Sequence, residues 1–181
     1  GGEAMVKDGL MERFGIEEVY GMHNQPGLPV GTFSIRPGAF YAATDNFTVD
    51  VVGKGAHAAR PHAGIDTTLV ASHIVIALQS IASRNLDPLK SLVVSVTSFR
   101  TESDAYNVIP EHVELRGTVR TFDKEVRALA EERFKAIATA TAEAFGAKAV
   151  VNYERGYPSM VNAETETGYA AEVAAKVSGK A

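Results

Sequence analysis

The stretch that decides the fold is residues 45–66, DNFTVDVVGKGAHAARPHAGID. Its first part alternates apolar and polar residues, as a strand with one buried face does; the apolar ones are Phe47, Val49 and Val51. Asp66 is a residue type that caps helices, and apolar residues follow it at helical spacing as far as about Arg84. Between this predicted strand and helix lies a loop, residues 53–62, in which His57 stands among small residues.

The same kinds of pattern continue toward the C-terminus. Strands are predicted around residues 92–96, 111–121 and 149–153. A second helix is predicted between a cap at Asp123 and a stop at Gly146. Its expected buried face consists of Val126, Ala130, Ile137, Thr141 and Phe145.

The predicted order over residues 45–154 is therefore β-α-β-β-α-β, the ferredoxin-like α+β arrangement. Right-handed crossovers place both helices on one face of an antiparallel sheet. The opposite face is polar and carries Arg120. Such a face is either solvated or turned toward a partner or a substrate.

The flanking segments have a different character. We expect a helix over residues 3–14 that ends at Gly15, short strands over 17–22 and 32–36, and a helix over 163–177. The chain thus divides into a compact unit, residues 45–154, between two partial segments, residues 1–44 and 155–181. Both ends suggest cuts through a longer protein.

Composition excludes several classes of protein. The chain has 181 residues, 45% of them apolar, and a net charge of -4 without a basic patch, which argues against nucleic-acid binding. It has no cysteine, so it forms no disulfide or thiolate metal site. We see neither a membrane span nor a signal peptide and expect a cytoplasmic protein.

Four residues are candidates for chemistry. His57 is either an ordinary surface histidine or a group exposed for catalysis, since flanking glycines let the backbone approach a ligand. His23 follows a predicted strand and either orders a turn or binds a metal. Asn107 lies in a turn, where asparagine is usually structural. Arg120 either clamps a carboxylate or pairs with surface neighbours. The other histidines are expected to be structural or solvated: His62, His73 and His112.

Four motifs carry a resemblance to a known family. They are GMHNQP at residues 21–26, GKGAHAARPHAGID at 53–66, YNVIPE at 106–111 and RGTVRT at 116–121. In this order they resemble the co-catalytic metallopeptidases that include aminoacylases, glutamate-releasing carboxypeptidases and hippurate hydrolases. The similarity is greatest to the hippurate hydrolase, or N-acyl-amino-acid amidohydrolase, branch.

The resemblance implies a fold and a set of roles. A zinc-peptidase-like α/β catalytic domain would be interrupted by a ferredoxin-like lid that also forms a homodimer. His23 would bind metal, and His57 would reach into the neighbour's active site to polarise the scissile carbonyl. Asn107 and Arg120 would hold the carboxylate of an N-acyl amino acid substrate.

The family also needs groups that this sequence lacks. Members use two divalent metal ions (Zn, Mn, Co or Ni), and one histidine cannot hold a metal pair. The general-base glutamate and the other ligands are missing, so we expect a fragment that is inactive by itself, although its parent is a metal-dependent amidohydrolase. The alternative is a non-catalytic dimerisation or small-molecule-binding module.

Overall fold

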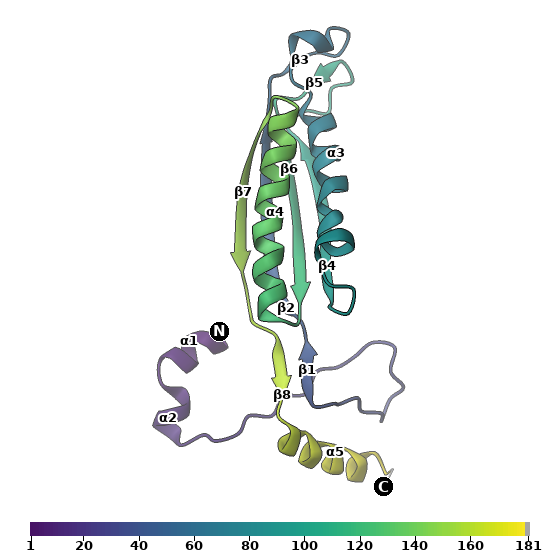
Figure 1. Cartoon of the computed structure of the whole chain (residues 1–181). Helices are drawn as coiled ribbons and strands as arrows, with labels where there is room; N and C mark the ends of the chain where they lie inside the picture. Colours follow the sequence, from purple (N-terminus) through teal and green to yellow (C-terminus); the bar gives the residue numbers. More distant parts are fainter. Residues whose placement is uncertain (180–181) are drawn as a thin grey trace. The chain divides into compact units, whose positions relative to one another are not determined.

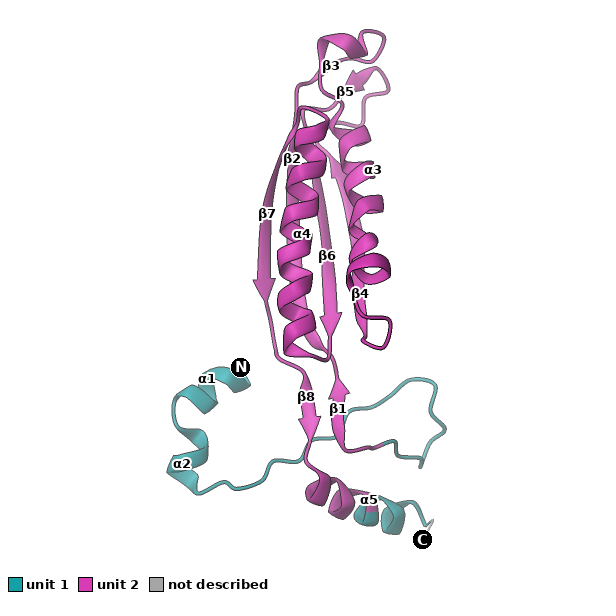
Figure 2. Ribbon diagram, in the orientation of Figure 1, with its two compact units in different colours: residues 1–34, 172–181 teal, residues 35–171 magenta. Residues whose placement is uncertain are grey.

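The computed structural model describes residues 1–179 and forms two compact units (Figure 2). One unit contains Gly1–Ser34 and the segment from Glu172 onward, and the other contains Ile35–Ala171. The predicted lid, residues 45–154, lies inside the larger unit, and its boundaries stay a prediction. No helix of residues 1–179 is long and apolar enough to cross a membrane.

The larger unit is built on a four-stranded sheet with the order β4-β6-β2-β7. All three pairings in it are antiparallel. The strands are β2 (Ala43–Val52), β4 (Leu92–Thr101), β6 (His112–Thr121) and β7 (Lys148–Arg155). The helices α3 (Thr67–Leu78) and α4 (Lys124–Ala144) cover one face of this sheet (Figure 1). The predicted ferredoxin-like arrangement is confirmed.

Both helices begin where the sequence predicted. The Asp66 carboxylate accepts hydrogen bonds from the backbone N–H groups of Thr68 and Leu69, and Asp123 caps α4 in the same way. Gly146, with φ of 77°, follows the end of α4. Helical structure continues to Asn85, about as far as predicted, but only Thr67–Leu78 is α-helical and Ile81–Asn85 forms a π-helical turn.

The core lies between the helices and the alternating apolar residues of the strands. The fully buried face of α4 has strict four-residue spacing and consists of Val126, Ala130, Phe134, Ala138 and Ala142. The predicted face was partly wrong: Ile137 and Thr141 are only half-buried, and Phe145 is 40% exposed because it follows the last helical residue. Phe134 was not predicted in this face; its ring centroid lies 4.4 Å from that of Phe47.

Two short ribbons extend the sheet at its opposite ends (Figure 1). At one end β3 (Ala56–His57) pairs with β5 (Val108–Ile109), beside a 3₁₀ turn at Pro61–Ala63. At the other end β1 (Gly38–Tyr41) pairs with β8 (Met160–Asn162). None of these four short strands was predicted. The C-terminal helix α5 (Glu164–Ser178) agrees with the predicted helix over 163–177.

The smaller unit differs most from prediction. The expected helix over residues 3–14 is two short helices, α1 (Gly2–Lys7) and α2 (Leu10–Phe14), because Gly9 between them has φ of 83°. The predicted stop at Gly15 is confirmed, with φ of 59°. The predicted strands over 17–22 and 32–36 are wrong: within residues 1–179 neither segment is paired with another strand.

Gly117 permits the closest approach within the sheet. It lies opposite Phe47 in β2, and the Phe47 ring covers the space that a side chain at 117 would need. A Cβ atom there would also clash with the carbonyl oxygen of Ser95. The glycine therefore lets an aromatic ring complete the core above β6.

We predict that Gly117→Ala destabilises the larger unit by about 1–3 kcal/mol or more, because backbone and ring must both move. Gly168→Ala is the control, since nothing lies within 4 Å of a Cβ at this position of α5. It should stabilise the helix by roughly 0.5–1 kcal/mol. Urea unfolding of both variants measures the difference, and equal effects would contradict the packing described for Gly117.

Candidate functional site

The first group of candidate residues lies in a distal lobe, which we define as residues 53–66 and 102–111. Two hydrogen bonds close the base of this lobe, and a third joins it to α3. The Gly53 N–H donates to the Glu111 carbonyl at 2.9 Å, and the Ile65 N–H donates to the Lys54 carbonyl at 2.9 Å. The buried Thr67 hydroxyl donates to the Pro110 carbonyl at 2.7 Å. The lobe is thus fixed to the N-terminus of α3 and to the ladder of β2 and β6.

His57 and Asn107 lie side by side in the distal lobe. His57 pairs with Val108 in the β3–β5 ribbon, and the Ala58 N–H donates to the Asn107 carbonyl at 2.9 Å. Asn107 lies in a turn that the Val108 N–H closes by donating to the Ala105 carbonyl. Both candidate side chains are exposed. The structure therefore brings together two residues that are fifty positions apart in the sequence.

The glycines of the lobe pack against the lobe itself. A Cβ atom at Gly53 would lie 2.7 Å from the Ile65 carbonyl oxygen and 2.7 Å from the Thr67 methyl carbon. One at Gly64 would lie 2.7 Å from the Ala56 Cβ, and one at Gly55 would lie 3.4 Å from the Ile109 carbonyl oxygen. Gly53 and Gly64 therefore let neighbouring backbone segments approach each other, whereas a Cβ at Gly55 would make only an ordinary contact. That Gly53 and Gly55 let the backbone approach a ligand stays a prediction.

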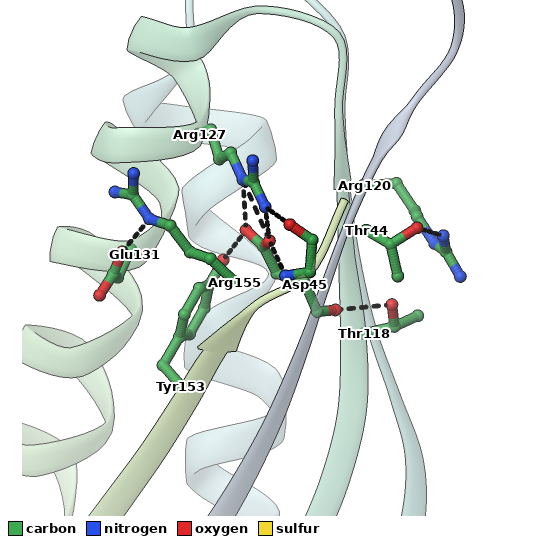
Figure 3. Close-up of polar contacts among 9 residues, drawn as sticks. Thr44, Asp45, Thr118, Arg120, Arg127, Glu131, Tyr153 and Arg155 are labelled. Atoms are coloured by element: carbon green, nitrogen blue, oxygen red, sulfur yellow. Dashed lines mark hydrogen bonds and ion pairs between the residues drawn. The ribbon is translucent and has the colours of Figure 1, made fainter. Parts of the chain in front are cut away.

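Arg120 lies at the opposite end of the sheet from the distal lobe. It is exposed near the end of β6, pairs with Thr44 in β2, and donates from Nη1 to the Thr44 hydroxyl (Figure 3). From Arg120 to His112 the extended strand covers about 26 Å at roughly 3.3 Å per residue, and the lobe lies beyond His112. Within one chain the structure does not bring Arg120 together with His57 and Asn107.

A buried ionic network lies beside Arg120 and was not predicted. The Asp45 side chain is 1% exposed and accepts hydrogen bonds from Arg127 Nε at 3.0 and 3.1 Å and from the Tyr153 hydroxyl at 3.0 Å (Figure 3). The Gly156 N–H also donates to Asp45, at 3.3 Å, while Arg127 Nη2 donates to the Gly156 carbonyl at 2.9 Å. The network fixes the chain where β7 turns toward β8.

The network shifts two proton equilibria. The hydrogen bond to Asp45 holds the pKa of the Arg127 guanidinium above its ordinary value. Burial, followed by the Asp45 charge, raises the pKa of the Tyr153 phenol. Arg127 and Tyr153 therefore hold their protons more tightly than free side chains do. Sequence reasoning had no local signal for this network, because Arg127 and Tyr153 are 82 and 108 positions from Asp45.

His23 belongs to the smaller unit, where its Nδ1 lies 2.6 Å from the Asn24 carbonyl oxygen. Of the remaining histidines, His62 is exposed in the distal lobe, His73 stacks on Phe145, and His112 Nε2 lies 3.1 Å from Asp50. Among residues 1–179, no three His, Cys, Asp or Glu side chains gather closely enough to hold a metal ion. The described residues do not by themselves fit a dinuclear metal centre.

The larger unit is thus a ferredoxin-like α+β unit that carries an exposed, histidine-bearing lobe. Residues 44–146 match the peptidase dimerisation domain of the M20 peptidases. The chain therefore belongs to this M20 dimerisation-domain family, as the sequence motifs had predicted.

The similarity to individual relatives reaches beyond residues 44–146 and covers nearly the whole chain. An N-acetyl-L-cysteine deacetylase of Bacillus subtilis is 43% identical over 97% of this chain and 42% of the relative. A hippurate hydrolase of Campylobacter jejuni is 36% identical over 99% of this chain and 47% of the relative. The crystal structure of a dinuclear metal-binding M20 peptidase from Bacillus subtilis matches with a TM-score of 0.70 at 32% identity. The match covers 97% of this chain and 42% of that protein. The chain spans a little under half the length of these curated relatives.

The raised pKa of Tyr153 predicts a loss of stability at alkaline pH. The unfolded chain releases this proton at about pH 10, before the folded chain does, so the free energy of unfolding falls as pH rises above about 10. Tyr153→Phe should flatten this fall, and Tyr169→Phe, which alters an exposed tyrosine of α5, should not. Urea unfolding between pH 8 and 11 measures the slopes. An unchanged slope in Tyr153→Phe would contradict the assignment.

Proposed function

We propose that the chain forms the dimerisation part, and a portion of the active site, of a metal-dependent amidohydrolase that cleaves N-acyl amino acids. One observation carries the proposal: His57 and Asn107 lie together on an exposed lobe, far along the sheet from Arg120. The named activities of the deacetylase and hippurate hydrolase relatives support an amide bond as the target.

The residue types fit the demands of amide hydrolysis. The reaction develops negative charge on the scissile carbonyl oxygen, and a positioned N–H donor such as the His57 imidazole stabilises that charge. An amino acid product also carries a carboxylate. Arg120 offers a planar guanidinium for bidentate recognition of this group, and the Asn107 amide can donate to the same substrate.

The distance between the two groups of residues calls for two chains. A small N-acyl amino acid cannot contact residues separated by the length of β6, about 26 Å or more. In a two-fold dimer each active site can instead take Arg120 from its own chain and the distal lobe from the partner. In the proposal, Asn107 therefore enters the site with His57 rather than with Arg120.

The α3 and β4 edge of the larger unit supplies a surface for the second copy. β4 is an edge strand of the four-stranded sheet, and unpaired strand edges pair readily with another strand. α3 buries Val70, Ile74 and Leu78 on one side but also exposes Leu69 (50%) and Ile76 (70%). A helix that is apolar on both sides is normally covered on both sides. The match to a dimerisation domain supports a second copy of the chain as the cover.

The proposal includes two divalent metal ions (Zn, Mn, Co or Ni), with His23 as one ligand. Its support is the dinuclear metal-binding relative and the position of His23 in the GMHNQP motif, on which the family resemblance rests. Such ions activate water and polarise carbonyl groups. The remaining ligands and the general base would come from parts of the full-length protein other than residues 1–179. A hippurate-like substrate and a cytoplasmic location complete the proposal.

A non-catalytic module is the second candidate function. The larger unit has its own continuous core, made by α3, α4 and the four strands, so it can act as a dimerisation or small-molecule-binding domain without an active site. Assays on the full-length protein distinguish the two candidates, since only the first requires amide hydrolysis.

We predict that His57→Ala in the full-length protein lowers kcat for hippurate or N-acetyl amino acids by about 10²–10³, the typical cost of one oxyanion donor. Metal content should not change, because His57 is not proposed to bind metal. His62→Ala is the matched control from the same lobe and should retain activity. Kinetics together with metal analysis test the role, and parallel loss of metal in His57→Ala would contradict it.

We also predict that Ile76→Glu weakens the dimer, because the charge would be buried against the second copy. Val150→Glu is the control: Val150 is 47% exposed on β7, the opposite edge strand. Sedimentation equilibrium of the 181-residue chain should show a dimer for the unmodified chain and Val150→Glu, and a shift toward monomer for Ile76→Glu. If only Val150→Glu dissociated the dimer, the proposed interface would be wrong and the β7 edge would form it instead.

A further inference from the structure

The imidazole ring of His57 has a fixed orientation within the distal lobe. The backbone N–H of Ala59 donates a hydrogen bond to His57 Nδ1 at 3.1 Å. A backbone amide can only donate, so Nδ1 must accept and carries no proton. In a neutral imidazole the proton then resides on the other nitrogen, Nε2.

We propose that the Ala59 backbone amide is the positioning group that keeps His57 in the Nε2–H tautomer, so that the donor of the proposed function is a neutral imidazole. The inference rests on the proposed function for its substrate, but its statement about the tautomer does not. A histidine can donate either as a neutral imidazole or as an imidazolium cation, and the contact with the Ala59 amide selects the neutral form.

The loop around His57 holds the Ala59 amide in place. The preceding amide, Ala58 N–H, donates to the Asn107 carbonyl at 2.9 Å, and the following one, Arg60 N–H, donates to the His57 carbonyl at 2.7 Å. Three consecutive amides are therefore engaged within the lobe. Because Nδ1 turns toward this backbone, the opposite side of the ring, with Nε2, turns away from it. The alanines at 58 and 59 leave that side uncovered.

The same geometry disfavours other roles for His57. A general base or a metal ligand needs a free lone pair on the outward nitrogen, which here carries the proton. A cationic ring would direct an Nδ1–H at the Ala59 N–H and lose the hydrogen bond.

General-base histidines are commonly oriented by a carboxylate on the second nitrogen. Of the described residues, no carboxylate hydrogen-bonds the His57 ring, whereas His112 on the sheet has Asp50 at 3.1 Å. Besides His57, the charged or titratable groups of the lobe are Lys54, Arg60, His62, Asp66, Glu102, Asp104, Tyr106 and Glu111.

The tautomer can be tested on the 181-residue chain itself. Long-range ¹H–¹⁵N correlation spectra of the imidazoles distinguish protonated from unprotonated ring nitrogens, and a His57→Ala spectrum identifies the His57 signals. At a pH where His57 is neutral, we expect Nδ1 to resonate as an unprotonated acceptor and Nε2 as a protonated nitrogen. A protonated Nδ1, or an even mixture of tautomers, would overturn the assignment.

The donor role is tested in the full-length protein with two isosteric amides. The side-chain N–H of His57→Gln reaches about as far as Nε2, whereas that of His57→Asn reaches only about as far as Nδ1. If removal of the donor costs about 10²–10³ in kcat, the Gln variant should recover at least about tenfold relative to Asn or Ala. Equal activity of the Gln and Asn variants would overturn the donor role.

The two experiments separate this inference from the proposed function. A full-length protein without amidohydrolase activity would refute the proposed function and the donor role with it, while the spectra would still decide the tautomer. An active protein in which Nδ1 is protonated would leave the function standing and refute the role of the Ala59 amide.

Discussion

The antiparallel ladder between β2 and β6 is the constraint on which the rest of the structure depends. It runs without a break from the Ala43–Thr121 pair to the Val52–His112 pair. Beyond Val52 the same two segments continue as the β3–β5 ribbon, which carries His57 and Asn107. At the other end the ladder carries Arg120. The separation of the two groups of candidate residues is thus a consequence of strand length, and a change of register would alter it.

The ladder is fixed by packing at one end and by charge at the other. In its middle Gly117 allows the Phe47 ring to lie over β6, and Phe134 of α4 packs on that ring. Near Arg120 the buried Asp45 binds Arg127 of α4 and Tyr153 of β7. An unpaired buried carboxylate would be costly, so the three elements must meet in this one arrangement. This accounts for a rigid unit that can present a lobe at a defined distance.

The sequence predicted the fold where the signal was local. Alternation identified the four long strands, and Asp66, Asp123 and Gly146 marked the helix boundaries because capping depends on neighbouring residues. Segments 17–22 and 32–36 have strand-like composition but find no strand partner among residues 1–179. Pairing cannot be read from one segment alone. The predicted face of α4 included Phe145 and lacked Phe134, because helical spacing alone does not show where a helix leaves the sheet.

The candidate site was predictable as residue types and not as an arrangement. His23, His57, Asn107 and Arg120 were found from motifs, but the two-residue strands that join His57 to Asn107 are too short to give a pattern. The long-range partners of Asp45 gave no local signal either. The structure groups Asn107 with His57 and separates both from Arg120, which turns a list of candidates into the proposal of a site shared between two chains.

The most direct test of that proposal is complementation between two inactive variants of the full-length protein, His57→Ala and Arg120→Ala. In a mixed dimer one site would receive both defects and the other neither. Equal amounts, dissociated and reassembled at random, should regain about a quarter of the unmodified activity, because half of the dimers are mixed and each has one intact site. Activity no greater than that of the separate variants would show that His57 and Arg120 of one chain serve the same site, and would contradict the account.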